Sequence, residues 1–112
     1  MTVTVKVLVP AKTAEAAQTV QYTAPAATKV IIDKFTATNY SASAATISVN
    51  LVTAAGAAAG SNLIVATKTL QPNATYTFPE LVGHVLEAAG TISTLKAGAG
   101  DLNIRVSGRE VT

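Results

Sequence analysis

The chain contains a single histidine, which is the first candidate for chemistry. His84 has two carboxylates close by in the sequence, Glu80 and Glu87, that could orient its ring. A nucleophilic mechanism also needs a nucleophile within reach of that ring. No serine lies in a GxSxG elbow or a similar setting, and the chain has no cysteine. We therefore expect no catalytic residue and no enzymatic activity, with His84 as a half-exposed residue of a short helical turn.

Carboxylates are the remaining candidates for a metal site. One histidine and no cysteine leave six acidic side chains as possible ligands. Four of them could approach one another in the folded chain: Asp33, Glu80, Asp101 and Glu110. Their spacing matches no calcium-binding loop, and a zinc site would need more nitrogen or sulfur ligands. We expect no bound metal.

Glycine-rich segments could in principle hold a phosphate group. The candidates are Gly56, Gly60 and the Gly98-Ala99-Gly100 segment. None is followed by Lys-Ser or Lys-Thr, and none opens a crossover helix, so the pattern lacks the parts of a phosphate loop. We interpret these glycines as turn residues and expect no cofactor.

Three tyrosines could form a platform for a sugar or a base. Tyr22, Tyr40 and Tyr76 would serve this purpose only if they were exposed together. Two of the three fall on the apolar side of their predicted strands, which favours packing in the core. The chain has no tryptophan to supplement them.

Two arginines lie near the end of the chain. Arg105 and Arg109 are expected to pair with Asp101 or Glu110 on a solvated face, or alternatively to form an ion pair between subunits. Lys and Arg total eight against six Asp and Glu, which gives a net charge of +2. This excess is small and scattered, so we expect no nucleic-acid partner.

The elements that position these side chains are predicted from alternating hydrophobicity. In residues 46–52 and 101–106 an apolar residue falls at every second position, which is typical of a strand with one dry face and one wet face. Residues 3–9 carry Val3, Val5, Val7 and Val9 on one face, and Pro10 is expected to end this strand. The wet faces must meet either water or another subunit.

Further strands are predicted over residues 19–24, 29–40, 63–70, 75–78, 91–97 and 101–111. The break in alternation at residues 30–32 indicates burial on both sides or a bulge. Because the link at residues 41–44 is short, the strands on either side of it should pair antiparallel. Residues 11–18 are interpreted as a loop. Residues 54–62 (AAGAAAGSN) should form a mobile loop or a long hairpin tip, since they lack large side chains.

Residues 80–89 are the only segment with a helical pattern, with Leu81, Val82, Val85 and Leu86 on one face and Gly83 and Gly90 limiting its length. The chain should thus form one domain over residues 1–112. We predict an all-β, antiparallel β-sandwich of about eight strands, either jelly-roll or immunoglobulin-like, with one short helical turn near residues 80–89.

The composition suits assembly better than small-molecule binding. Hydrophobic residues make up 49% of the chain, but alanine supplies 22 of them and the aromatic share is only 4%. Binding pockets usually rely on aromatic side chains and convergent polar groups. Charged residues make up 12%, about half the usual share, and a β-rich surface of low charge tends to associate. No apolar stretch reaches the length of a membrane helix, so we expect no membrane partner.

Residues 29–111 resemble small structural proteins of tailed bacteriophages. The resemblance lies in VIIDKFTATNYSASAATISVNLV, LQPNATYTF, ELVGHVLEAAGTISTLKA and DLNIRVSGREV. The matching positions are Asn39, Leu70, Pro72, Leu81, Gly83, Leu86, Gly90, Ser107, Gly108 and Glu110. An aspartate is common after the position of Gly90, where this chain has Thr91.

The resemblance implies a virion component such as a capsid decoration or cement protein, or a piece of the neck or tail. Its expected partners are other copies of itself and other virion proteins, met through flat surfaces or strand edges. A carbohydrate-binding or adhesive β-sandwich is the alternative.

Overall fold

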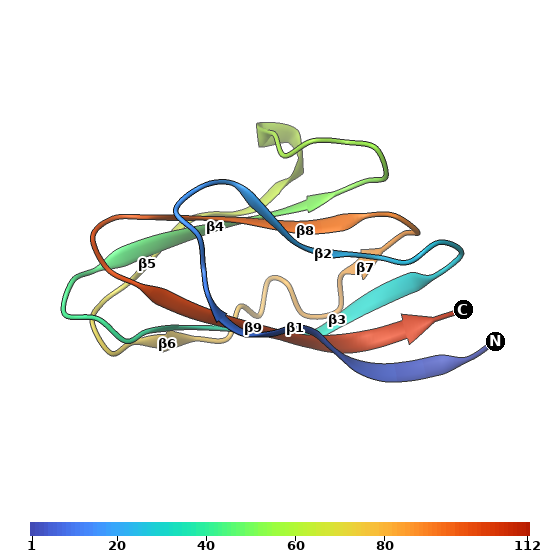
Figure 1. Ribbon diagram of the computed structural model, residues 1–112, viewed down its shortest axis with the longest axis horizontal. Helices are drawn as coiled ribbons and strands as arrows, with labels where there is room; N and C mark the ends of the chain where they lie inside the picture. The colour runs from blue at the N-terminus through green and yellow to red at the C-terminus, as the bar shows by residue number, and fades with distance from the viewer.

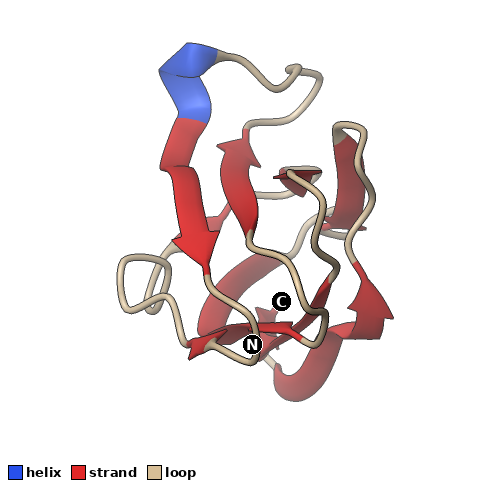
Figure 2. Ribbon diagram, turned by 90° about the vertical axis from the view of Figure 1, so that its left-hand side faces the viewer, coloured by secondary structure: helices blue, strands red, loops and turns tan.

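The computed structural model describes residues 1–112 as two antiparallel sheets packed face to face (Figures 1 and 2). The elements in chain order are β1 (Val3–Thr13), β2 (Thr19–Thr23), β3 (Lys29–Asn39), β4 (Ala45–Val52), the 3-10 helix η1 (Gly60–Asn62), β5 (Leu63–Leu70), β6 (Thr75–Tyr76), β7 (Val85–Leu86), β8 (Thr91–Ala97) and β9 (Leu102–Val111). Sheet A has the order β1-β9-β3-β6, with β7 also paired to β3, and sheet B has the order β2-β8-β4-β5. The predicted all-β sandwich is confirmed.

The strand pairs are nested along the chain. β4 pairs with β5, β3 with β6 and β7, β2 with β8, and β1 with β9, so the chain resembles one long hairpin rolled into two layers. This is the strand arrangement of a jelly roll, one of the two alternatives that the sequence left open. No helix is long or apolar enough to cross a membrane.

The short link between β3 and β4 joins the two sheets, so the prediction that these strands pair with each other is wrong. Asn39, at the end of β3, is fully buried and organises this corner. Its amide nitrogen donates to the carbonyl oxygens of Ser43 (2.8 Å) and Leu70 (3.0 Å), and its side-chain oxygen accepts from the Ser41 amide (2.9 Å). These bonds replace the ladder that a hairpin would have provided.

The core lies between the two sheets and consists of aliphatic side chains around a small aromatic group. Phe35 of β3 meets Phe78 edge to face at 4.8 Å, and Tyr76 meets Phe78 at 4.7 Å. Phe35 and Phe78 are fully buried. Such contacts stabilise a core beyond the area they bury. The bulge predicted near residues 30–32 is found as a register shift between Ile32 and Lys34.

The prediction of a helical turn over residues 80–89 is wrong in detail. The Gly83 amide donates to the Ile32 carbonyl (2.7 Å), and the Ile32 amide donates to the His84 carbonyl (3.0 Å). The backbone of this segment therefore bonds mainly to β3, and two of its residues form strand β7. Within residues 80–89 the His84 amide donates to the Leu81 carbonyl (3.3 Å), which closes a single turn and not a helix. Gly83 has a φ of +89°, which interrupts any helix there. The four apolar side chains are split, with Leu81 and Leu86 buried and Val82 and Val85 about half exposed.

Candidate functional site

The most exposed large apolar side chain of any strand is Val5 of β1. Val3, Val5 and Val7 are 51%, 83% and 40% exposed, and we call them the outer valine row. They project from the face of sheet A that points away from the core, which we call the outer face of sheet A. Three neighbouring β-branched side chains facing solvent are unusual, because each would contribute stability if it were buried.

A bulge explains why the valines point outward. The register of β1 against β9 shifts between Val7 and Val9 and again between Val9 and Lys12. Leu8 is the extra residue of the first shift, and both Leu8 and Val9 are buried. The prediction that Val9 shares a face with the other three valines is therefore wrong. Pro10 lies inside β1 and does not end it, which an edge strand tolerates at an irregularity.

The apolar surface continues across sheet A in one row of paired residues. Val5 pairs with Arg109 of β9, Arg109 with Ile31 of β3, and Ile31 with Val85 of β7. The Arg109 guanidinium donates to the Asp33 carboxylate through Nε (3.0 Å) and Nη2 (2.9 Å). This bidentate pair raises the pKa of Arg109 and lies within the apolar row. The predicted partners of Arg109, Asp101 and Glu110, are not the ones it meets.

A basic hollow lies next to the apolar row on the same face. It has a volume of about 320 Å³ and is lined by Lys34 and Thr36 of β3 and Arg105 and Ser107 of β9. Neither Lys34 nor Arg105 forms an ion pair within the chain, so the predicted pairing of Arg105 with Asp101 or Glu110 is wrong. The outer face of sheet A thus presents unpaired positive charge beside exposed valines.

Part of the corresponding face of sheet B is covered by the chain itself. Ser48 and Asn50 of β4 lie on the wet face predicted for residues 46–52, yet both are buried. The hairpin tip at residues 54–62 rises over this face, as the segment above β4 and β8 in Figure 1 shows. The Asn50 side chain donates to the Ala59 carbonyl (3.0 Å) and to the Asn62 side chain (2.7 Å).

Asn62 holds the rest of the same loop. Its side-chain oxygen accepts from the Ala59 amide (3.0 Å), and its amide nitrogen donates to the Ala57 carbonyl (2.9 Å). The loop has no large apolar side chain to bury, so its polar framework could not be predicted from hydrophobicity. The long hairpin tip is confirmed, and its order comes from asparagine side chains instead of a packed core.

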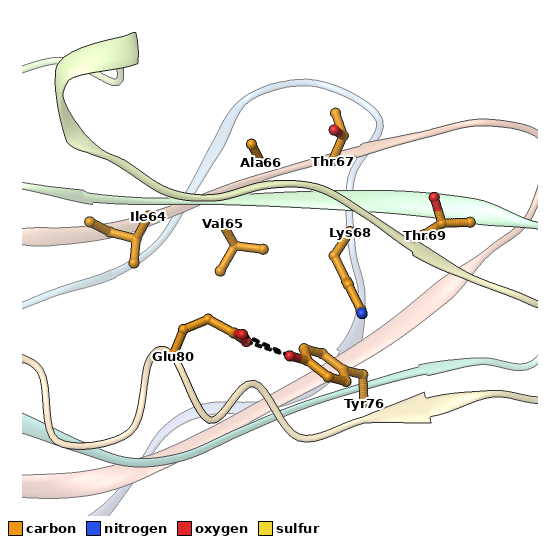
Figure 3. Close-up of a pocket in the computed structure, with 8 residues that line it drawn as sticks. All are labelled: Ile64, Val65, Ala66, Thr67, Lys68, Thr69, Tyr76 and Glu80. Carbon is orange, nitrogen blue, oxygen red and sulfur yellow. Dashed lines mark hydrogen bonds between the residues drawn. The ribbon is translucent and has the colours of Figure 1, made fainter.

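A shallow groove separates β5 from the segment that follows β6 (Figure 3). Its volume is about 480 Å³. It is lined by residues of β5, among them Lys68, and on the opposite side by Tyr76 and Glu80. The Tyr76 hydroxyl donates to the Glu80 carboxylate at 2.7 Å, which raises the pKa of Tyr76. The Lys68 ammonium lies 4.3 Å from the centre of the Tyr76 ring. These three side chains contact one another, and no acid, base or nucleophile in the groove is arranged for catalysis.

A polar contact between the sheets lies near the chain ends. The Tyr22 hydroxyl of β2 donates to Glu110 of β9 at 2.6 Å, and Lys6 of β1 pairs with the same carboxylate at 3.1 Å. The Tyr22 hydrogen bond, followed by Lys6, lowers the pKa of Glu110, and burial raises the pKa of Tyr22. This contact ties the free end of β1 to both sheets.

The candidate residues for chemistry do not converge. His84 is exposed, while Glu80 bonds to Tyr76 and Glu87 pairs with Lys29 at 3.7 Å, so neither carboxylate orients its ring. No three acidic or histidine side chains gather in a way that could hold a metal ion. The three tyrosines also lie apart. Tyr22 and Tyr76 pack against the core, as predicted, and Tyr40 is half exposed.

Known proteins provide no further guidance: no protein-family model, curated sequence or solved structure matches this chain.

Proposed function

We propose that the protein is a non-enzymatic structural component of a tailed-phage virion that binds its neighbours through the outer face of sheet A. One observation carries this proposal. The chain covers the centre of the polar face of sheet B, at Ser48 and Asn50, but leaves three valines and two unpaired cations exposed on sheet A. A surface of this kind is typical of a protein–protein contact.

The chemistry of the outer face specifies the kind of neighbour. Full burial of a valine side chain contributes about 1.5 kcal/mol, so an apolar partner surface would gain from contact with the outer valine row. Lys34 and Arg105 would remain unpaired against a neutral surface. The neighbour should therefore combine an apolar strip with carboxylates placed opposite the basic hollow.

The fold and the sequence resemblance support a virion as the setting. Jelly rolls are common among viral capsid proteins, although fold alone does not determine function. Several positions of the resemblance have structural roles in this chain. Asn39 organises the corner between the sheets, and a side chain at Gly108 would meet the Ile31 carbonyl. These roles explain why such residues would recur in a shared fold.

The first test is mass spectrometry of purified virions made by the phage that encodes the protein. We expect the protein in stoichiometric amount, and its absence from the particles would refute the proposal. The second test uses virions that lack the protein and measures rebinding of purified variants by sedimentation.

In that second test, the double variant Lys34→Glu/Arg105→Glu should rebind about tenfold more weakly than the wild type, which corresponds to about 1.4 kcal/mol. Lys68→Glu, which reverses a charge in the groove beside β5, is the matched control and should rebind normally. Equal losses for the double variant and this control would exclude the outer face of sheet A as the contact.

A further inference from the structure

The outer valine row lies on an open strand edge, and its backbone groups point into solvent. β1 is the outermost strand of sheet A, paired only with β9 (Figure 1). Thr2 and Thr112 exchange both backbone hydrogen bonds, at 3.1 and 2.9 Å. In an antiparallel ladder, bonded and non-bonded pairs alternate. From this starting pair, Thr4 and Lys6 bond to β9, whereas Val3, Val5 and Val7 direct their N–H and C=O groups away from it.

Protection of this edge is confined to its second half. The two register shifts and Pro10 disrupt β1 from Val7 onward, and such irregularities prevent other strands from pairing. Residues 3–7 keep an unbroken register with β9. Lys6 is the one charged residue among them, and its ammonium is already paired with Glu110 at 3.1 Å. This half of the edge is regular, apolar on its outer side and open.

We propose that residues 3–7 pair antiparallel with the same residues of a second copy of this chain, about a two-fold axis at Val5. The sequence Val-Thr-Val-Lys-Val is nearly the same in both directions. This register places Val5 opposite Val5 and Val3 opposite Val7, and it places Lys6 opposite Thr4 instead of a second lysine. The three valines of each copy already present the correct backbone groups, so the joined edge gains about six hydrogen bonds.

Charge complementarity also favours a second copy. In the joined sheet, Thr4 of one copy lies between its own Glu110 and Lys6 of the other copy, because Thr4 pairs with Glu110 across β9. Each Glu110 carboxylate therefore shares a row with Lys6 of the other copy, in addition to its contact with Lys6 of its own chain from the neighbouring row. On the outer side, the two valine rows form one continuous apolar ladder, and cross-strand pairs of β-branched residues stabilise a sheet.

The contact is short, so it should be weak in solution and reinforced in an array. Five paired residues bury less than the ~1,000 Å² typical of a stable dimer. Repeated copies on a symmetric particle would add their contacts through high effective concentration. The pairing deepens the proposed function and rests on it for its setting, but it can be tested without any particle.

Cysteine cross-linking tests the register directly, since the chain has no cysteine of its own. Paired residues that exchange hydrogen bonds have Cα atoms about 5.5 Å apart, within the range that a disulfide spans. Val5→Cys should cross-link about tenfold faster than Val20→Cys, which is 56% exposed on the β2 edge of sheet B. A mixture of Val3→Cys and Val7→Cys should cross-link faster than either variant alone. Equal rates for Val5→Cys and Val20→Cys, or fastest linking of Val3→Cys with itself, would overturn the proposal.

Proline substitution tests the backbone directly. Val5→Pro removes an N–H that faces the open edge, so it should abolish the concentration-dependent dimer in light scattering with little effect on the melting temperature. Lys6→Pro removes an N–H that bonds to β9 and should lower the melting temperature instead. A Val5→Pro protein that still dimerises would refute the pairing. A wild-type protein that is monomeric at all concentrations but still binds virions would refute only the pairing. A wild-type protein that dimerises but is absent from virions would refute only the proposed function.

Discussion

Replacing Asn39 with alanine should destabilise the protein more than any other single change of a polar side chain. The Asn39 side chain is fully buried where the chain passes from sheet A to sheet B. It makes four hydrogen bonds, donating to the Ser43 and Leu70 carbonyls and accepting from the Ser41 amide and from the Ser41 hydroxyl at 2.6 Å. Alanine removes all four at once.

The loss of stability in Asn39→Ala depends on which hydrogen-bond partners of Asn39 can bond to water instead. Ser41 is partly exposed, so its amide and hydroxyl can bond to solvent in the variant. Leu70 is buried, and its carbonyl would lose a partner at a cost of about 1–3 kcal/mol. With about 1 kcal/mol for each of the two bonds from Ser41, the total loss should be at least about 3 kcal/mol. Asn39→Asp has the same shape but faces two carbonyl oxygens with a carboxylate, so its loss at neutral pH should be at least as large.

Urea unfolding followed by circular dichroism measures this loss. With a slope of about 1.5 kcal/mol/M, the midpoint of Asn39→Ala should fall by at least about 2 M. Asn103→Ala is the matched control, because Asn103 is exposed on β9 and accepts one hydrogen bond, from Thr13 at 2.9 Å. Its midpoint should move by less than about 0.5 M. Similar midpoints for the two alanine variants would show that the corner does not depend on Asn39.

Three further predictions concern other parts of the fold. Tyr22→Phe should cost about 1.5–3 kcal/mol in thermal unfolding at about pH 7, because it removes a hydrogen bond to a charged group. The pKa of Glu110 is lowered in the folded state, so this stabilisation is present above the ordinary carboxyl value of 4.5 and is lost as the pH falls below it. The stabilities of the wild type and the variant should then converge as the pH falls well below 4.5, and a constant difference would contradict the assignment. Gly108→Ala should cost about 1–3 kcal/mol or more in urea, since its new methyl group would collide with the Ile31 carbonyl, and an unchanged midpoint would contradict the close approach of β9 and β3. Asn62→Ala should accelerate hydrogen exchange of residues 57–62 with little change elsewhere, and unchanged exchange there would show that the loop has another source of order.

The alternation in the sequence was sufficient to predict the strands, because a period of two is a local property of the backbone. It could not determine which side of a strand faces the core. In β1 the extra residue Leu8 reverses the faces, so Val3, Val5 and Val7 point outward although their pattern is that of a buried face. A bulge of this kind depends on the neighbouring strand, and no residue of β1 alone signals it.

The polar faces of β4 and β9 differ in exposure, although the two strands have similar sequence patterns. Asn50 of β4 is buried under the hairpin tip that Asn62 holds in place, and Ser48 is buried with its hydroxyl accepting from the Thr67 amide of β5 (2.9 Å). Arg105 and Ser107 of β9 have no such cover and line the basic hollow. The sequence identified both faces as polar, but only the tertiary structure shows which of them is available to a partner.

Hydrogen exchange of the protein, free and bound to virions, tests most directly whether sheet A carries the assembly contacts. We expect binding to slow exchange in residues 3–7 and in the exposed parts of β3 and β9, because their open amides and outer face would become covered. Residues 54–62 should exchange at the same rate in both states. Protection that appears only in residues 54–62, with β1 unchanged, would contradict the assignment of the assembly surface to sheet A.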